Sequence, residues 1–63
     1  MIMWIELTDR NHQRISVNFG NVDYFVEDGD ETELYINNTK FPLYVNESYS
    51  EVKELLVEAI ENS

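Results

Sequence analysis

The segment YFVEDGDETELYI, residues 24–36, decides how the middle of this chain folds. Residues that favour strands flank an acidic run, Glu27 to Glu31, which is interrupted by Gly29. Alternation with a period of two predicts β-strands, and an Asp-Gly pair between two such runs predicts a tight turn because glycine tolerates a positive φ. We therefore expect a β-hairpin whose tip carries several carboxylates.

Alternating segments on both sides of this hairpin predict further strands. They lie at residues 2–8, 14–19, 22–27, 32–37 and 41–45. The polar run at 9–13 is typical of a turn, and Pro42 favours an edge position for the last strand because proline cannot donate a backbone hydrogen bond. We expect an antiparallel sheet of four to five strands.

The period changes after residue 47. Ser48 precedes Glu51 by three residues, which is the spacing of a capping box. Apolar residues then recur at helical intervals, at Val52, Leu55, Leu56, Ala59 and Ile60. The sequence predicts one C-terminal amphipathic helix that buries these residues against the sheet, and hence a single α+β domain over residues 1–63.

Size and charge limit the function of the protein. The chain has 63 residues, no cysteine and a formal charge of −9. A domain this small, without disulfides, is often stabilised by association with a second copy. The acidic charge disfavours direct binding of duplex nucleic acid and favours a partner with a basic surface. No apolar run is long enough to span a membrane, so we expect no membrane partner and a location in the cytoplasm of a host bacterial cell.

The strand pattern places several aromatic residues on the sheet face that the helix is not expected to cover. They are Trp4, Phe25, Tyr35 and Tyr44. Aromatic residues with polar atoms are enriched in protein interfaces, so these four are predicted to form the interface of a homo-oligomer. A platform for stacking nucleic-acid bases is the alternative, which the negative charge disfavours.

Two groups of carboxylates are candidates for binding a basic partner. They are Asp28, Asp30 and Glu31 at the hairpin tip and Glu51, Glu54 and Glu58 on the helix. A solvated surface is the ordinary explanation of both groups. The functional interpretation is mimicry of a polyanion, in which the carboxylates occupy an Arg/Lys channel that normally holds nucleic acid.

The sequence contains little that predicts catalysis or metal binding. The acidic hairpin does not match the ligand spacing of an EF-hand loop, and His12 is the only histidine. No cysteine is available as a nucleophile, and the serines have structural roles as strand or capping residues. We therefore expect a protein that is not an enzyme, with no catalytic residues, no metal and no cofactor.

Three segments resemble the FlbD/SwrD-type small flagellar proteins and similar short proteins of phages and prophages. The segments are IELTDRNHQRISVNFGNVDYF, TELYIN and VNESYSEVKELL. The matching positions are Ile5, Leu7, Thr8, Val17, Asn18, Val45, Glu47, Ser48, Glu51 and Val52. The order of strands followed by a helix is also similar to that of the transcriptional positive cofactor four and of small anti-CRISPR proteins with that architecture.

Charge, size and resemblance together predict a non-enzymatic, acidic, homo-oligomeric binding protein. Its expected role is that of a phage or prophage accessory protein that inhibits a host factor, such as a defence complex. One alternative is a FlbD/SwrD-like modulator of flagellar function. The other is an oligomer that sequesters a small nucleotide ligand at its interface.

Overall fold

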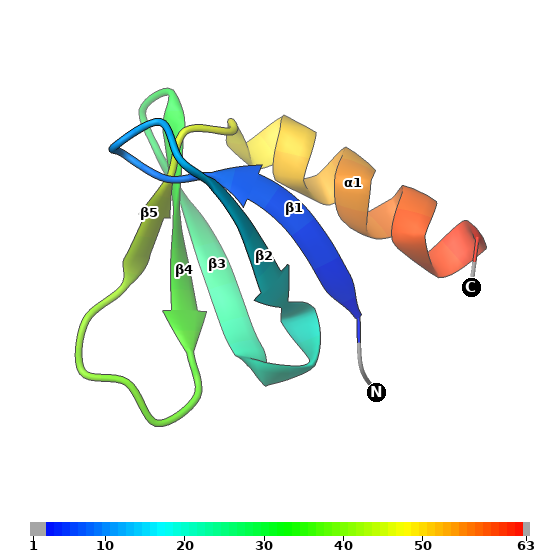
Figure 1. The fold of residues 1–63 in the computed structure, drawn as a ribbon, viewed down its shortest axis with the longest axis horizontal. Helices are drawn as coiled ribbons and strands as arrows, with labels where there is room; N and C mark the ends of the chain where they lie inside the picture. The colour runs from blue at the N-terminus through cyan, green and yellow to red at the C-terminus, as the bar shows by residue number, and fades with distance from the viewer. Residues whose placement is uncertain (1–2, 63) are drawn as a thin grey trace.

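The computed structural model describes residues 3–62, which form five strands, one 3-10 turn and one helix (Figure 1). The elements are β1 (Trp4–Thr8), β2 (Arg14–Asn18), η1 (Phe19–Asn21), β3 (Val22–Asp28), β4 (Glu31–Ile36), β5 (Leu43–Val45) and α1 (Tyr49–Glu61). The predicted α+β class and the order of strands before the helix are confirmed. The predicted start of the first strand at residue 2 lies outside the described residues.

The strands form two antiparallel sheets, so a single sheet of four to five strands is not confirmed. β1 pairs with β2, and β3, β4 and β5 form a second sheet in that order. The end of β1 meets the end of β5, where Asp9 and Val45 form a β-bridge and the Asn46 amide donates a hydrogen bond of 2.8 Å to the Thr8 carbonyl. β5 lies at a sheet edge, as Pro42 predicted, although the strand begins after Pro42.

The core lies between the two sheets and the helix. Its buried apolar residues are Ile5, Leu7, Val17, Leu34, Val45 and Val52. α1 contacts β1, β3 and β4, and runs beside β1 in Figure 1. Leu55, Leu56 and Ala59 are partly buried against the core, as the helical pattern predicted. The predicted burial of Ile60 is wrong, because its side chain is 54% exposed where the last turn of α1 extends beyond the sheets.

Hydrogen bonds fix the first turn of α1 to both sheets. The predicted capping box is present: the Ser48 hydroxyl accepts from the Glu51 amide at 3.2 Å, and the Glu51 carboxylate accepts from the Ser48 amide at 3.1 Å. The Glu47 carboxylate accepts from the Thr8 amide at 2.9 Å, and the Glu47 carbonyl accepts from the buried Thr32 hydroxyl at 2.8 Å. The start of the helix is therefore tied to β1 and β4.

In the hairpin of β3 and β4, the predicted turn is confirmed, but the predicted direction of Phe25 is wrong. Its tip is the tight turn expected at Gly29, whose φ is 58°. The strand register shifts between Val22 and Tyr24, however, and this bulge reverses the alternation that follows it. Phe25 therefore pairs with Leu34 on the core side, and the prediction that Phe25 faces outward is wrong.

Candidate functional site

The structure divides the four predicted interface aromatics among three environments. Trp4 projects from β1 and is 63% exposed. Phe25 packs against the core, with its ring 5.3 Å from that of Tyr49 on α1. Tyr35 and Tyr44 lie on the outer face of the second sheet, since their neighbours Leu34 and Val45 are buried. The four side chains therefore do not form one continuous patch.

The outer face of the second sheet carries a tyrosine face, consisting of Tyr24, Tyr35 and Tyr44. The rings of Tyr24 and Tyr35 are stacked, with centroids 4.6 Å apart and planes at 10°. Burial, together with the nearby Glu33 carboxylate, raises the pKa of the Tyr35 hydroxyl. Sequence periodicity missed Tyr24 because only the bulge places it opposite Tyr35.

Arg10, in the turn between β1 and β2, covers part of the tyrosine face. Its guanidinium carbon lies 3.8 Å from the centre of the Tyr44 ring, within the range of a cation–π contact. The guanidinium also donates hydrogen bonds of 2.8–3.2 Å to both carboxylate oxygens of Glu31. These bonds hold the pKa of the Glu31 carboxyl below its usual range and raise the pKa of Arg10. Arg10 is thus an internal partner for one of the predicted acidic residues.

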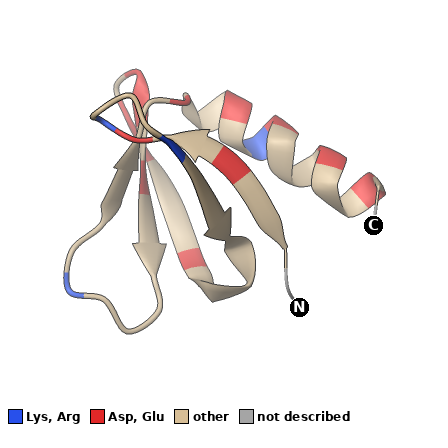
Figure 2. Ribbon diagram, in the orientation of Figure 1, with Lys and Arg blue, Asp and Glu red and all other residues tan. Residues whose placement is uncertain are grey.

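The predicted acidic residues lie at the hairpin tip and along the outer side of α1 (Figure 2). Two of them have structural partners, since Glu31 binds Arg10 and Glu51 completes the capping box. The other four are exposed and form no ion pair within residues 3–62: Asp28, Asp30, Glu54 and Glu58. These four, called here the free carboxylates, are the ones available to an external cation.

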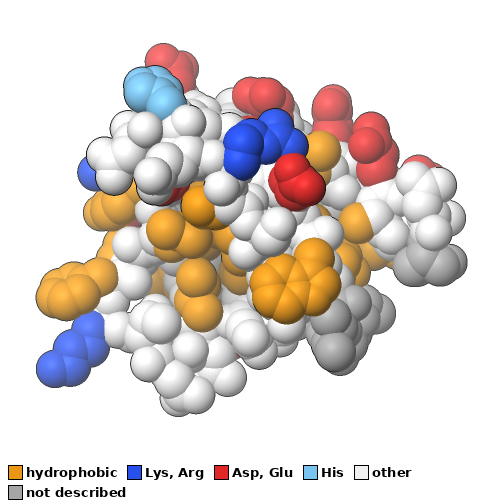
Figure 3. Space-filling model, viewed as in Figure 1, with side chains coloured by type: hydrophobic (Ala, Val, Ile, Leu, Met, Phe, Trp, Pro, Cys, Tyr) orange, Lys and Arg blue, Asp and Glu red, His pale blue; other side chains and the backbone are white. Residues whose placement is uncertain are grey.

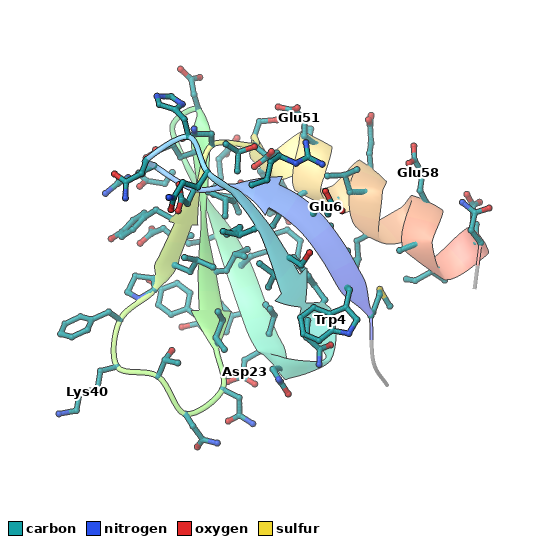
Figure 4. The ribbon with its side chains drawn as sticks, viewed as in Figure 1. Trp4, Glu6, Asp23, Lys40, Glu51 and Glu58 are labelled. Carbon is teal, nitrogen blue, oxygen red and sulfur yellow. The ribbon has the colours of Figure 1, made fainter. Side chains whose placement is uncertain are left out.

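A surface groove adjoins Trp4, on the side of the molecule seen in Figures 3 and 4. It lies between β2 and the second sheet and has a volume of about 390 Å³. Its apolar lining is Trp4, Ile15, Val17, Ile36 and Leu43, and its polar lining is Ser16, Asn18 and Asn21. Figure 3 shows apolar side chains in the middle of this side and acidic side chains along its upper border. We call this feature the Trp4 groove.

A second hollow of about 320 Å³ lies between η1, β3 and α1. Its lining includes Met3, Phe19, Val22, Phe25 and Leu56. Neither this hollow nor the Trp4 groove is lined by a lysine or arginine.

Histidine and clusters of carboxylates are the groups of this chain that could support catalysis or metal binding. His12 lies in the turn between β1 and β2 with a φ of 63°, and its Nδ1 is 3.5 Å from the side-chain Nδ2 of Asn46. Within residues 3–62, no group of three or more His, Asp or Glu side chains is placed to hold a metal ion. In the same part of the chain, no helix combines the length and apolar character needed to cross a membrane.

Comparison with known proteins does not suggest a function, so a functional assignment must rest on the surfaces described above. No protein-family model matches the chain, and no curated protein or solved structure matches it significantly. The resemblance to small flagellar and phage proteins therefore stays a prediction.

Proposed function

We propose that this protein is a non-enzymatic binding protein whose partner is a protein with a basic surface. The observation that carries the proposal is the set of free carboxylates, Asp28 and Asp30 at the hairpin tip and Glu54 and Glu58 on α1. Within residues 3–62 the ion pairs are Arg10–Glu31 and Arg14–Glu6, which leave most of the acidic charge without a cation. A partner bearing lysine and arginine would supply the missing charge.

The arrangement of the helical carboxylates supports mimicry of a polyanion. Glu54 and Glu58 are four residues apart on α1, so they project from the same side of the helix about 6 Å apart along its axis. Because the helix is already folded, binding requires ordering of these side chains but not of the backbone that carries them. A channel lined by lysine and arginine, of the kind that holds a nucleic-acid backbone, is the surface that such an array would fill.

The proposed biological role is that of a phage or prophage accessory protein which inhibits a host factor, such as a defence complex. An inhibitor of this kind needs no catalytic group. It acts by occupying the nucleic-acid channel of the host factor, and its affinity comes from charge complementarity.

The test uses charge reversal at two exposed acidic positions. A tagged wild-type chain is used to recover partners from bacterial cells, and each recovered protein is purified and titrated with the wild type, with Glu58→Lys and with Asp23→Lys. Both variants change the net charge equally, but Asp23 lies on β3, on the lower side of the view in Figure 4, whereas Glu51 and Glu58 lie on its upper side. Glu51 is not used, because its reversal would also remove the capping box.

Glu58→Lys is expected to weaken binding at least about tenfold, and Asp23→Lys to leave it nearly unchanged. The dissociation constant of the wild type is expected to rise steeply with salt, because attraction between exposed charges is screened over about 8–10 Å at 0.1–0.15 M. Equal effects of the two reversals, or an affinity insensitive to salt, would show that α1 is not the binding surface.

A further inference from the structure

Trp4 and the groove beside it form a projection and a hollow on the same side of the molecule. The indole is 63% exposed, and it borders a groove of about 390 Å³ (Figure 4). The floor of the groove is supplied by β2, β4 and β5, through Ile15, Ile36 and Leu43. A surface with a projecting apolar side chain next to an apolar hollow can complement itself across a two-fold axis, in which each patch faces its own copy.

The charge distribution favours a second copy of this chain as the occupant. β2 and β5 contain no acidic residue, and the polar residues that line the groove, Ser16, Asn18 and Asn21, are neutral. On the outer side of the neighbouring strand β1, Glu6 is paired with Arg14. Two chains of charge −9 repel one another, so they associate most readily through a side that brings no unpaired carboxylates together. The helix, the hairpin tip and the other side of Trp4, where Glu6 and Glu58 line a separate hollow, do not meet this condition, whereas the Trp4 groove does.

The backbone of β2 also favours a second copy of this chain as the occupant of the groove. β2 pairs with β1 along one edge, and no strand within residues 3–62 pairs with its other edge, which borders the groove. An open strand edge is a template for pairing with another chain. Ser16, at the centre of β2, is exposed and lines the groove, so a charge introduced there would lie in the proposed interface.

We propose that a second copy of this chain docks on the Trp4 groove, forming a symmetric dimer in which each protomer inserts its Trp4 into the groove of the other. This inference does not depend on the proposed basic partner, because it rests on the apolar lining of the Trp4 groove and the open edge of β2 and not on the free carboxylates. It replaces the interface predicted from the sequence, which combined Trp4 with Phe25, Tyr35 and Tyr44.

The experiment measures mass by sedimentation equilibrium at micromolar concentrations for the wild type, Trp4→Glu and Tyr24→Glu. Tyr24 is the matched control, because it is similarly exposed at 56% but lies on the tyrosine face. The wild type and Tyr24→Glu are expected to have twice the 7.5 kDa mass of the chain. Trp4→Glu is expected to raise the dimer dissociation constant at least about tenfold, as the loss of an aromatic interface anchor does.

A second variant and an optical signal complete the test. Ser16→Glu keeps Trp4, the single tryptophan of the chain, and is also expected to dissociate the dimer. On dilution of the wild type, Trp4 emission should shift to longer wavelength over the concentrations at which the mass falls. Circular dichroism verifies that each variant is folded. A monomeric wild type, or a dimer dissociated by Tyr24→Glu and retained in folded Ser16→Glu, would overturn the proposal.

Discussion

At the scale of single residues, Arg10 shows how a side chain in a turn connects the two sheets. It lies between β1 and β2, yet it binds Glu31 of β4 and covers the ring of Tyr44 on β5. The Arg10 side chain is about half exposed, and contacts of this kind contribute little stability individually because solvent screens them. The clearest effect of Arg10 is therefore on the pKa of Glu31.

The carboxyl of Glu31 is expected to titrate below the usual pKa of glutamate, because Arg10 donates hydrogen bonds to its charged form. The pair therefore contributes stability above the ordinary pKa of glutamate, and this contribution is lost as the pH falls through the lowered pKa of Glu31. In an NMR titration, Arg10→Gln should raise the pKa of Glu31 towards its ordinary value. Lys40→Gln removes an equal charge far from the hairpin tip (Figure 4) and should leave the titration of Glu31 unchanged.

Gly29 is expected to be the most sensitive position of the hairpin tip. Its φ is 58°, a conformation that costs a residue with a Cβ about 1–2 kcal/mol. An added Cβ would meet no atom within 4 Å, so the cost of Gly29→Ala is conformational and not steric. Urea unfolding should show this loss for Gly29→Ala and a smaller one for Gly29→Asn, because asparagine tolerates the left-handed region. Equal losses for the two variants would contradict this explanation.

At the scale of elements, α1 is held more firmly at its first turn than along its length. The capping box, the Glu47 carboxylate and the Thr32 hydroxyl fix the start, and Val52 is the helical residue that is completely buried within residues 3–62. The second half of the helix presents Leu55, Leu56 and Ala59 to the core only in part. The helix therefore covers one end of the core and leaves the last turn largely exposed.

Two identical substitutions in α1 test this difference. Val52→Ala should lower the free energy of unfolding by about 1–3 kcal/mol, because it removes two buried methyl groups and leaves space behind. Val57→Ala, at a side chain that is 50% exposed, should change it by no more than about 0.5 kcal/mol. Both values come from urea denaturation monitored by circular dichroism. Similar losses at both positions would mean that α1 packs through a different side.

At the scale of the whole molecule, charge and apolar surface are separated. The free carboxylates lie on α1 and at the hairpin tip, whereas the Trp4 groove has a neutral lining. The two surfaces meet at Trp4, because the hollow on the other side of Trp4 is lined by Glu6 and Glu58. Association with a basic partner through the hairpin tip and the outer side of α1, and association with a second copy through the Trp4 groove, would otherwise use different residues. The two processes should also differ in their response to salt.

Added salt is expected to affect the two associations in opposite directions. Screening removes the attraction between free carboxylates and a basic partner, so that affinity should fall. The same screening reduces repulsion between two chains of charge −9 while leaving apolar burial in place, so the dimer should persist or tighten. Sedimentation of the isolated chain at low and physiological salt measures the second effect. A dimer that dissociates as salt rises would indicate an interface held by ion pairs.

The sequence by itself determined the features that depend on local interactions. Strand periodicity identified the strands, Gly29 identified the turn, whose two residues are Gly29 and Asp30 and not the expected Asp28 and Gly29, and Ser48 with Glu51 identified the start of the helix. Each of these signals arises within a few residues of chain, through side-chain alternation, a positive φ or a capping hydrogen bond. The sequence also shows where the acidic residues lie along the chain, but it does not show which of them form ion pairs.

Only the tertiary structure decided how these elements meet. The bulge between Val22 and Tyr24 moved Phe25 into the core and Tyr24 onto the outer face, and the two sheets separated the tyrosine face from Trp4. Ile60 is exposed because the last turn of α1 extends beyond the sheets. The Trp4 groove forms where β2 lies beside β4 and β5. These outcomes depend on contacts between residues far apart in the chain, and an alternating pattern gives the two faces of a strand without specifying which strand or helix will cover each face.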